Sequence, residues 1–167
     1  MKNIYIDMDG VLNAISTKPP KQNTQWYGDW NTATVKGYPI LWSTELIAEL
    51  NTLSERGDVQ FIVLSTWREE ALTVLAPVLG LNTHGWDFIH VPDTSMFVYS
   101  AWWKLEEIQT HLEESKPEKA VWIDDDILYY QPAMDWGYSV SNLKIVCPHT
   151  PHGLSKPHLS GIIKFLA

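Results

Sequence analysis

Short runs of apolar residues alternate along this chain with longer segments in which apolar residues recur at helical spacing. Three of these runs, residues 4–6, 61–64 and 120–123, are rich in β-branched and aromatic residues, which is typical of buried strands. Strands that alternate with helices form a parallel sheet with helices on both faces. The pattern therefore predicts an α/β fold with a Rossmann-like parallel sheet.

The expected elements extend along the whole chain. Strands are predicted at 3–6, 59–64, 87–91, 119–123 and 144–147, and helices at 44–56, 68–79, 101–115 and 157–166. Residues 13–43 are expected to be irregular, with a short β-hairpin flap among them. The segment after the acids at 124–126 is also expected to be irregular. Because no linker, repeat or low-complexity tract interrupts this order, we expect a single domain over residues 1–167.

Polar side chains follow the three apolar runs at the points where the predicted strands end. The first run is followed by Asp7 and Asp9, the second by Ser65 and Thr66, and the third by Asp124, Asp125 and Asp126. Lys104 stands near the start of a predicted helix between the second and third runs. Ligands of open α/β sheets bind beyond the carboxyl ends of the strands, so we expect these side chains to converge there. Neighbouring carboxylates repel each other unless a metal ion or a proton neutralises them.

Each of these features also has a purely structural interpretation. Asp9 and Gly10 suit a turn after a strand, and the hydroxyls of residues 65 and 66 suit the cap of the next helix. The acids at 124–126 suit a helix N-terminus, where negative charge is favoured. Lys104 by itself is typical of a solvated helix surface. The order of all four features at strand ends is what favours a functional site.

Taken in this order, the four features resemble the motifs of the haloacid dehalogenase (HAD) superfamily of aspartate-based phosphohydrolases. The resemblance covers about residues 3–130. It implies that Asp7 is the nucleophile that forms an aspartyl-phosphate, and that Asp9 is the general acid and then the general base. It also implies that Ser65 hydrogen-bonds the transferring phosphoryl group and that Lys104 neutralises its charge.

The same resemblance implies a Mg2+ ion, a cation that prefers hard oxygen ligands. The expected ligands are Asp7, Asp9 through its backbone carbonyl, Asp124 and Asp125. Asp125 is favoured over Asp124 as the direct ligand because the pattern ends in paired acids. Asp126 is expected to cap the following turn.

The segments that hold a cap domain in this superfamily are short here. Residues 13–43 and 69–103 leave room for a flap but not for a domain, which implies an open site and an extended substrate such as a phosphorylated nucleic-acid end. Substrate contacts are expected from Thr66, Arg68 and Trp30. One alternative is a 5′(3′)-nucleotidase or another small-molecule phosphatase, and a second is a catalytically weak binding or regulatory module. Three short matches, Asp-Met-Asp-Gly-Val-Leu-Asn, Trp-Ile-Asp-Asp and Gly-Leu-Ser with His-Leu, are similar to HAD domains of bacterial and phage proteins linked to RNA repair.

Charge and composition narrow the choice of partners. A net charge of −8 argues against broad nonspecific binding of nucleic acids, but residues 11–28 and 144–167 contain lysines and no acid, so they are expected to attract phosphates locally. Five of the nine tryptophans lie near the predicted site, where they either stack on bases or pack the flap against the sheet: Trp26, Trp30, Trp67, Trp102 and Trp103. There is no apolar run long enough to span a membrane, no export signal at the start, and one cysteine, Cys147, so the cytosol is the expected compartment.

Overall fold

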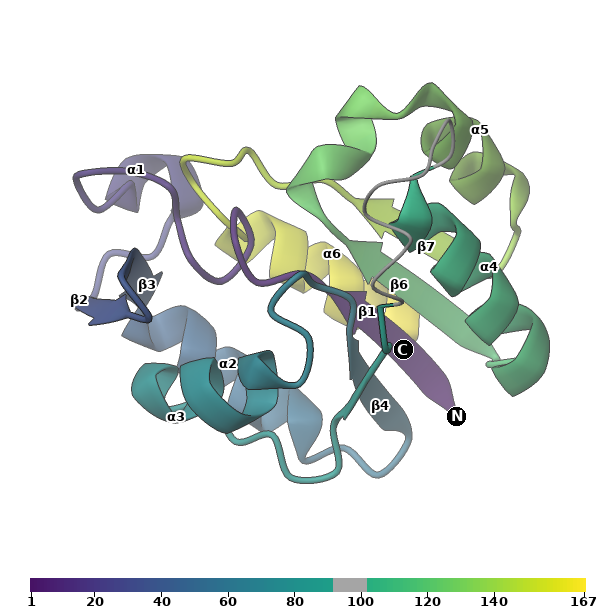
Figure 1. Ribbon diagram of the computed structural model, residues 1–167, viewed down its shortest axis with the longest axis horizontal. Helices are drawn as coiled ribbons and strands as arrows, with labels where there is room; N and C mark the ends of the chain where they lie inside the picture. The colour runs from purple at the N-terminus through teal and green to yellow at the C-terminus, as the bar shows by residue number, and fades with distance from the viewer. Residues whose placement is uncertain (92–101) are drawn as a thin grey trace.

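The computed structural model describes residues 1–91 and 102–167, and a five-stranded parallel sheet lies at its centre (Figure 1). In spatial order the strands are β5 (Asp87–Phe88), β4 (Val59–Val63), β1 (Lys2–Ile6), β6 (Lys119–Ile123) and β7 (Leu143–Val146). In the middle of the sheet, Ile6 of β1 lies opposite Val63 of β4 and Ile123 of β6. The polar residues that follow these three strands therefore leave the sheet at the same level. The predicted parallel α/β sheet is confirmed.

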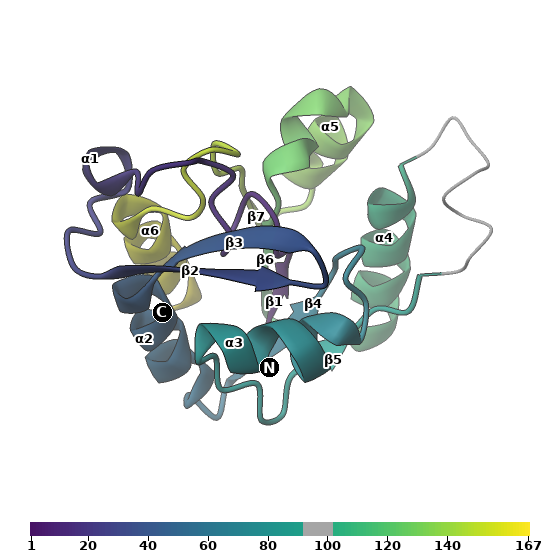
Figure 2. The same ribbon diagram turned by 60° about the vertical axis from the view of Figure 1, so that its left-hand side comes forward.

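Helices cover both faces of the sheet. The described residues form α1 (Lys21–Thr24), α2 (Thr44–Ser54), α3 (Ala76–Leu79), α4 (Trp103–Ser115), α5 (Gln131–Ser139) and α6 (Lys156–Leu166). Ile4 and Ile6 belong to the core that α2, α3 and α6 cover, whereas Tyr5 belongs to the core under α4 and α5 (Figure 2). A strand buried on both faces is apolar at nearly every position, which explains the continuous apolar runs. Within the described residues, no helix combines the length and the apolar character needed to cross a membrane.

The flap expected within residues 13–43 is a two-stranded antiparallel hairpin formed by β2 (Trp30–Val35) and β3 (Tyr38–Ser43). Lys36 and Gly37 form its tip, and both have positive φ angles, 52° and 83°. A two-residue turn of this kind matches the twist of the strands that it joins. Val35, Ile40 and Trp42 pack into the same core as α2, so the hairpin is fixed to the body of the protein and crosses above α3 (Figure 2).

The helix predicted at 68–79 is interrupted. Residues 66–69 form turns, a π-helical turn η1 (Ala71–Leu75) follows, and only Ala76–Leu79 is α-helical. Pro77 has no backbone N–H to donate to the preceding turn, so the regular α-helical ladder is broken there. Arg68 adopts a left-handed backbone conformation with φ of 55°, which few residues other than glycine adopt.

The prediction of an irregular segment after the acids at 124–126 is wrong. A 3-10 turn η2 (Asp125–Tyr129) leads directly into α5. Pro132 and Gly137 made this helix hard to predict, because both residues disfavour helix interiors. The tertiary structure explains Gly137, since a Cβ there would lie 2.1 Å from Cδ1 of Ile145 on β7. A larger residue at this position would require the side chain of Ile145 to shift.

Candidate active site

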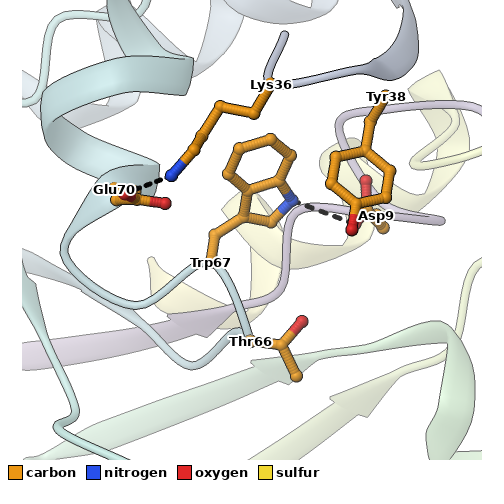
Figure 3. Close-up of a pocket in the computed structure, with 6 residues that line it drawn as sticks. All are labelled: Asp9, Lys36, Tyr38, Thr66, Trp67 and Glu70. Atoms are coloured by element: carbon orange, nitrogen blue, oxygen red, sulfur yellow. Dashed lines mark hydrogen bonds and ion pairs between the residues drawn. The ribbon is translucent and has the colours of Figure 1, made fainter.

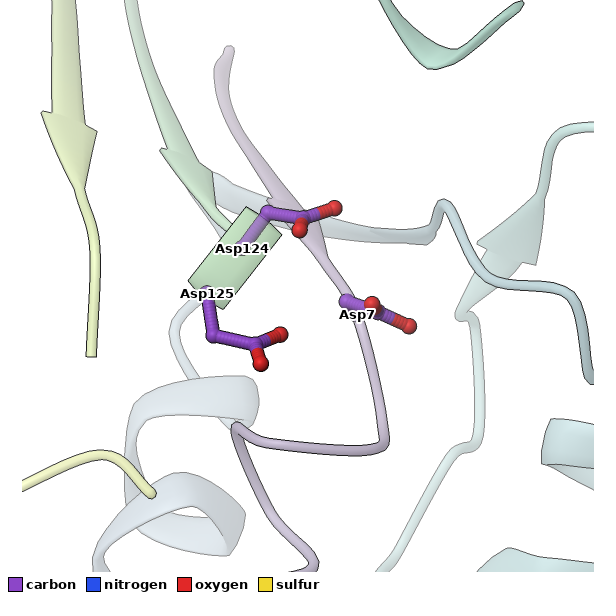
Figure 4. Close-up of side chains that lie close together, drawn as sticks. All are labelled: Asp7, Asp124 and Asp125. Carbon is purple, nitrogen blue, oxygen red and sulfur yellow. The ribbon is translucent and has the colours of Figure 1, made fainter. Parts of the chain in front are cut away.

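Three buried carboxylates meet at the carboxyl edge of the sheet. Asp7 follows β1, and its backbone N–H donates to the carbonyl oxygen of Ile123 at 3.0 Å, which extends the pairing between β1 and β6. Asp124 and Asp125 follow β6, so the in-register pairing of the two strands brings all three acids together (Figure 4). One carboxylate oxygen from each lies within 4.8 Å of the others, and all three residues are buried.

Lys104 lies among these acids, near the start of α4. Its Nζ is 2.6 Å from Oδ2 of Asp7 and 2.6 Å from Oδ2 of Asp124. Burial by itself would lower the pKa of Lys104, but the charges of Asp7 and Asp124 outweigh it and hold the pKa above its ordinary value. Burial and the charge of Asp7 raise the pKa of Asp124, and Lys104 opposes that rise. The structure therefore places Lys104 in contact with Asp7 and Asp124, at the edge of the sheet where the sequence predicted it.

Asp125 lies on the other side of the acid group. Its Oδ2 accepts a hydrogen bond of 2.6 Å from Oγ1 of Thr150, in the loop after β7. Burial raises the pKa of Asp125 to about 6, and the bond from Thr150 acts in the opposite direction. Gly10 passes close by with φ of 74°, and a Cβ there would lie 2.1 Å from Oδ2 of Asp125. Any larger residue at this position would displace the carboxylate.

The chemistry of this group fits a divalent cation with hard oxygen ligands. Asp7, Asp124 and Asp125 bring three carboxylates into one buried space, whereas Lys104 brings one ammonium group. The remaining negative charge is costly in a buried site unless a proton or a cation offsets it. Carboxylates at this separation match the ligands that Mg2+ prefers.

The side chain of Asp9 is held at both of its oxygens. Nδ2 of Asn13 donates to Oδ1 at 2.8 Å, and Nε1 of Trp67 donates to Oδ2 at 2.9 Å. Asn13 in turn accepts a hydrogen bond from the backbone N–H of Leu41 on β3, at 2.9 Å. The orientation of Asp9 therefore depends on the turn after β4 and on the hairpin.

The residues expected to contact the substrate differ in how far they are exposed to solvent. Thr66 is exposed beside Asp9, whereas Ser65 is 1% exposed and its Oγ accepts from the backbone N–H of Trp67 at 3.3 Å. Arg68 is half-buried in the same turn. Trp30 is also half-buried, and its Nε1 donates to the carbonyl oxygen of Trp26 at 3.0 Å. The roles of these residues in substrate binding stay predictions.

Two neighbouring pockets share lining residues at this edge. One, of about 340 Å³, is lined by Asp7, Asp125, Lys104, Thr150, Trp102 and neighbouring residues. The other, of about 520 Å³, lies under the hairpin tip and is lined by Asp9, Lys36, Tyr38, Thr66, Trp67 and Glu70 (Figure 3). Asp9 and Thr66 line both pockets. A phosphate next to Asp7 would therefore have space beside Asp9 for the group that it is attached to.

The sequence interpretation missed some of the residues that build this site and misplaced others. Thr150 and Asn13 were assigned no role, although Thr150 is a polar residue after the end of a strand, the signal that identified the acids. Trp67 was placed near the site for stacking or packing, and its hydrogen bond to Asp9 was not foreseen. The interpretation that bases stack on Trp26 is wrong, because its ring is 1% exposed and its Nε1 donates to the carbonyl oxygen of Leu154.

The sheet and the four polar segments at its carboxyl edge define an α/β domain of the HAD type. The chain matches the family described as the HAD domain in Swiss Army Knife RNA repair proteins over residues 3–159, and it belongs to this family. The match confirms the resemblance to HAD domains linked to RNA repair, and it extends beyond residue 130, where the four superfamily motifs end. No curated protein and no solved structure matches the chain. HAD domains are typically phosphohydrolases.

Proposed function

We propose that this chain is a Mg2+-dependent phosphatase that acts through an aspartyl-phosphate on phosphorylated nucleic-acid ends or nucleotides. The observation that carries the proposal is the position of Asp7. Its Oδ2 accepts a hydrogen bond from buried Lys104, and its carboxylate belongs to the three-acid group. Asp7 also lines the same pocket as Asp9. A carboxylate placed in this way is suited to attack a phosphate that the surrounding groups hold.

In the first step of the proposed reaction, an oxygen of Asp7 attacks phosphorus and the bond from phosphorus to the leaving oxygen breaks. Asp9 gives a proton to that oxygen, so that an alcohol leaves. In the second step, Asp9 takes a proton from water, whose oxygen attacks phosphorus and releases Asp7 and inorganic phosphate. The hydrogen bonds from Asn13 and Trp67 support this role, because they fix the carboxylate of Asp9 beside both pockets.

Mg2+ would be held by Asp7, Asp125 and the backbone carbonyl of Asp9, with Asp124 beside them. Both oxygens of Asp124 accept hydrogen bonds, Oδ2 from Lys104 at 2.6 Å and Oδ1 from the backbone N–H of Asp126 at 2.9 Å. These bonds support Asp125 as the direct ligand and Asp124 as the residue that positions Lys104. When bound, the cation supplies positive charge that stabilises the transferring phosphoryl group.

Lys104 would supply the second positive charge. The negative charge on a transferring phosphoryl group is stabilised by preorganised donors in a site that excludes water. The ammonium group of Lys104 is buried and already shared between Asp7 and Asp124, so it needs little reorganisation to contact an oxygen of a phosphate next to Asp7.

Two observations support nucleic acid as the substrate class. The family is described by its occurrence in RNA repair proteins. In addition, the two acid-free stretches at 11–28 and 144–167 pack against each other beside the site. Nδ2 of Asn23 lies 3.0 Å from Nε2 of His152, and the backbone N–H of Ile15 donates to the carbonyl oxygen of Thr150. Lys18, Lys21 and Lys156 are exposed on this surface, where they can attract phosphates of a strand.

A phosphatase screen with Mg2+ tests the proposal. The substrates are p-nitrophenyl phosphate, mononucleotides, oligonucleotides phosphorylated at the 3′ or the 5′ end, glycerol phosphate and a phosphopeptide. We expect phosphate release from the nucleic-acid substrates that requires both Mg2+ and Asp7. The absence of Asp7-dependent release from every substrate would contradict phosphatase activity, whereas a preference for mononucleotides would favour the nucleotidase.

A further inference from the structure

The pocket under the hairpin tip combines an exposed aromatic ring with a charged pair. The aromatic side chain of Tyr38 is exposed, with 64% of the residue's surface accessible to solvent. Its ring meets the indole of Trp67 edge-on, with centroids 6.0 Å apart and an angle of 69° between the planes. Lys36 and Glu70 also line the pocket and form an ion pair (Figure 3). This pair joins the hairpin tip, which carries Lys36, to the segment after β4, which carries Glu70.

The position of Asp9 connects this pocket to the chemistry of the proposed function. The acid that protonates the leaving oxygen must lie beside the group that departs. Asp9 lines the pocket under the tip, and it does not line the neighbouring apolar pocket of about 610 Å³ on the other side of the hairpin. The group attached to the phosphate is therefore expected under the tip, next to Tyr38 and Trp67.

From this geometry, and resting on the proposed function, we propose that the pocket under the hairpin tip binds the nucleobase of the nucleoside that carries the phosphate. The base stacks on the exposed ring of Tyr38, and its polar edge reaches Lys36 and Glu70. The pocket of about 520 Å³ has the size of small-molecule sites in proteins.

Each part of this pocket matches a feature of a base. An aromatic ring offers a stacking surface to any base because every base has a π-face. Base edges carry both hydrogen-bond donors and acceptors, and the ammonium of Lys36 and the carboxylate of Glu70 provide the matching groups. The side chains of Lys36 and Glu70 are 49% and 48% exposed, and an exposed ion pair opens at low cost when a ligand competes for it. A sugar phosphate without a base would leave Tyr38 unused.

Ligand binding tests the pocket without turnover. Isothermal titration calorimetry with Mg2+ is carried out in an Asp7→Asn background, with adenosine 5′-monophosphate, adenosine 3′-monophosphate and glycerol phosphate as probes. We expect Tyr38→Ala to raise the Kd of at least one nucleotide about tenfold, the effect of losing one base–aromatic stack. The Kd of glycerol phosphate is expected to change much less, whereas Tyr38→Phe keeps the ring and the affinity.

Tyr138 on α5 is 73% exposed, and Tyr138→Ala removes the same ring away from the pocket, so nucleotide binding should be unaffected. If Tyr38→Ala proves unstable, Tyr38→Leu removes the ring and keeps apolar bulk. Unchanged nucleotide affinity, or equal losses for nucleotide and glycerol phosphate, would overturn the base pocket. Failure of the unmutated chain to release phosphate would instead contradict the proposed function, and binding would still decide the pocket.

Discussion

Oγ1 of Thr150 donates a hydrogen bond to Oδ2 of Asp125 at 2.6 Å, and this bond joins the loop after β7 to the acid that follows β6. Loss of a partner that orients a metal ligand typically lowers metal affinity by about ten- to a hundredfold. We therefore expect Thr150→Val to raise the Mg2+ concentration for half-maximal activity about tenfold. Titrations of activity and of Tm with Mg2+ check this.

The matched control for this prediction is Thr52→Val. The hydroxyl of Thr52 donates to the carbonyl oxygen of Ala48 inside α2, at 3.1 Å, and should not affect the response to Mg2+. Thr150→Ser keeps a hydroxyl and should restore most of the affinity. An unchanged Mg2+ requirement in Thr150→Val would show that Asp125 needs no help from this side chain.

Asp7→Asn tests the nucleophile. An amide cannot attack phosphorus, so we expect kcat to fall by a factor on the order of 10⁴ or more, the effect of removing a covalent nucleophile. Phosphate release from p-nitrophenyl phosphate measures the loss, and circular dichroism checks the fold. Asp135→Asn, on the exposed surface of α5, is the control and should keep full activity. Residual activity of Asp7→Asn above one per cent or so, with contaminating phosphatase excluded, would remove Asp7 from this role.

Trp67→Phe tests whether the indole N–H holds Asp9 in place for proton transfer. Phenylalanine keeps an aromatic ring but loses the bond of 2.9 Å from Nε1 to Oδ2 of Asp9. We expect kcat to fall about tenfold for an alkyl phosphate and much less for p-nitrophenyl phosphate, whose leaving group needs no proton. Asp9→Asn should show the same preference more strongly.

Trp86→Phe provides the control for Trp67→Phe. It also removes an indole N–H, the one that donates to Oγ of Ser54 at 2.7 Å. Any loss of activity there should be equal for the two substrates. Equal losses for the two substrates in Trp67→Phe would argue that its effect on activity is purely structural.

The stability of the metal-free protein should depend on Asp125. Burial raises the pKa of Asp125 to about 6, above that of an unfolded aspartate, so between about pH 4 and about pH 6 the folded state holds a proton that the unfolded state has lost. The contribution of Asp125 to the free energy of unfolding therefore falls by up to about 3 kcal/mol as pH rises through this window.

Urea unfolding in EDTA at several pH values measures this contribution. We expect Asp125→Asn, which cannot ionise, to gain stability relative to the parent as pH rises from about 4 to about 6. Asp135→Asn should show no such trend. With Mg2+ present the difference should reverse, because bound cation stabilises only the protein that retains the carboxylate. A difference that does not vary with pH would contradict the raised pKa.

Substrate length should matter if the acid-free stretches contact a strand. We expect a higher kcat/KM for a phosphorylated oligonucleotide than for the matching mononucleotide, with an advantage that shrinks as salt rises. Lys21→Ala should reduce the advantage, and Lys116→Ala, after the end of α4, should not. Trp30→Ala tests stacking of a base on Trp30 in the same assay. Equal or better kcat/KM for the mononucleotide at low salt would favour the nucleotidase.

Much of the fold and of the acid group could be predicted from local sequence. Residues 4–6 and 120–123 are continuous apolar runs, which marks strands buried on both faces, and Asp7, Asp124 and Asp125 follow them directly. Neighbouring parallel strands end at one edge, so the meeting of these acids follows from the element order. The hairpin was also predictable, but α5 was not, because Gly137 is explained only by its contact with Ile145.

The kind of fold and the acids at the carboxyl edge of the sheet follow from residues that are adjacent in the chain. The distant side chains that hold those acids come together only through the packing of the folded chain. Thr150 reaches Asp125 across 25 positions, and Trp67 reaches Asp9 across 58. The same packing buries Trp26 and leaves Tyr38 exposed. Hydrogen bonds and burial of this kind depend on how elements pack, and no local pattern of residues encodes that packing.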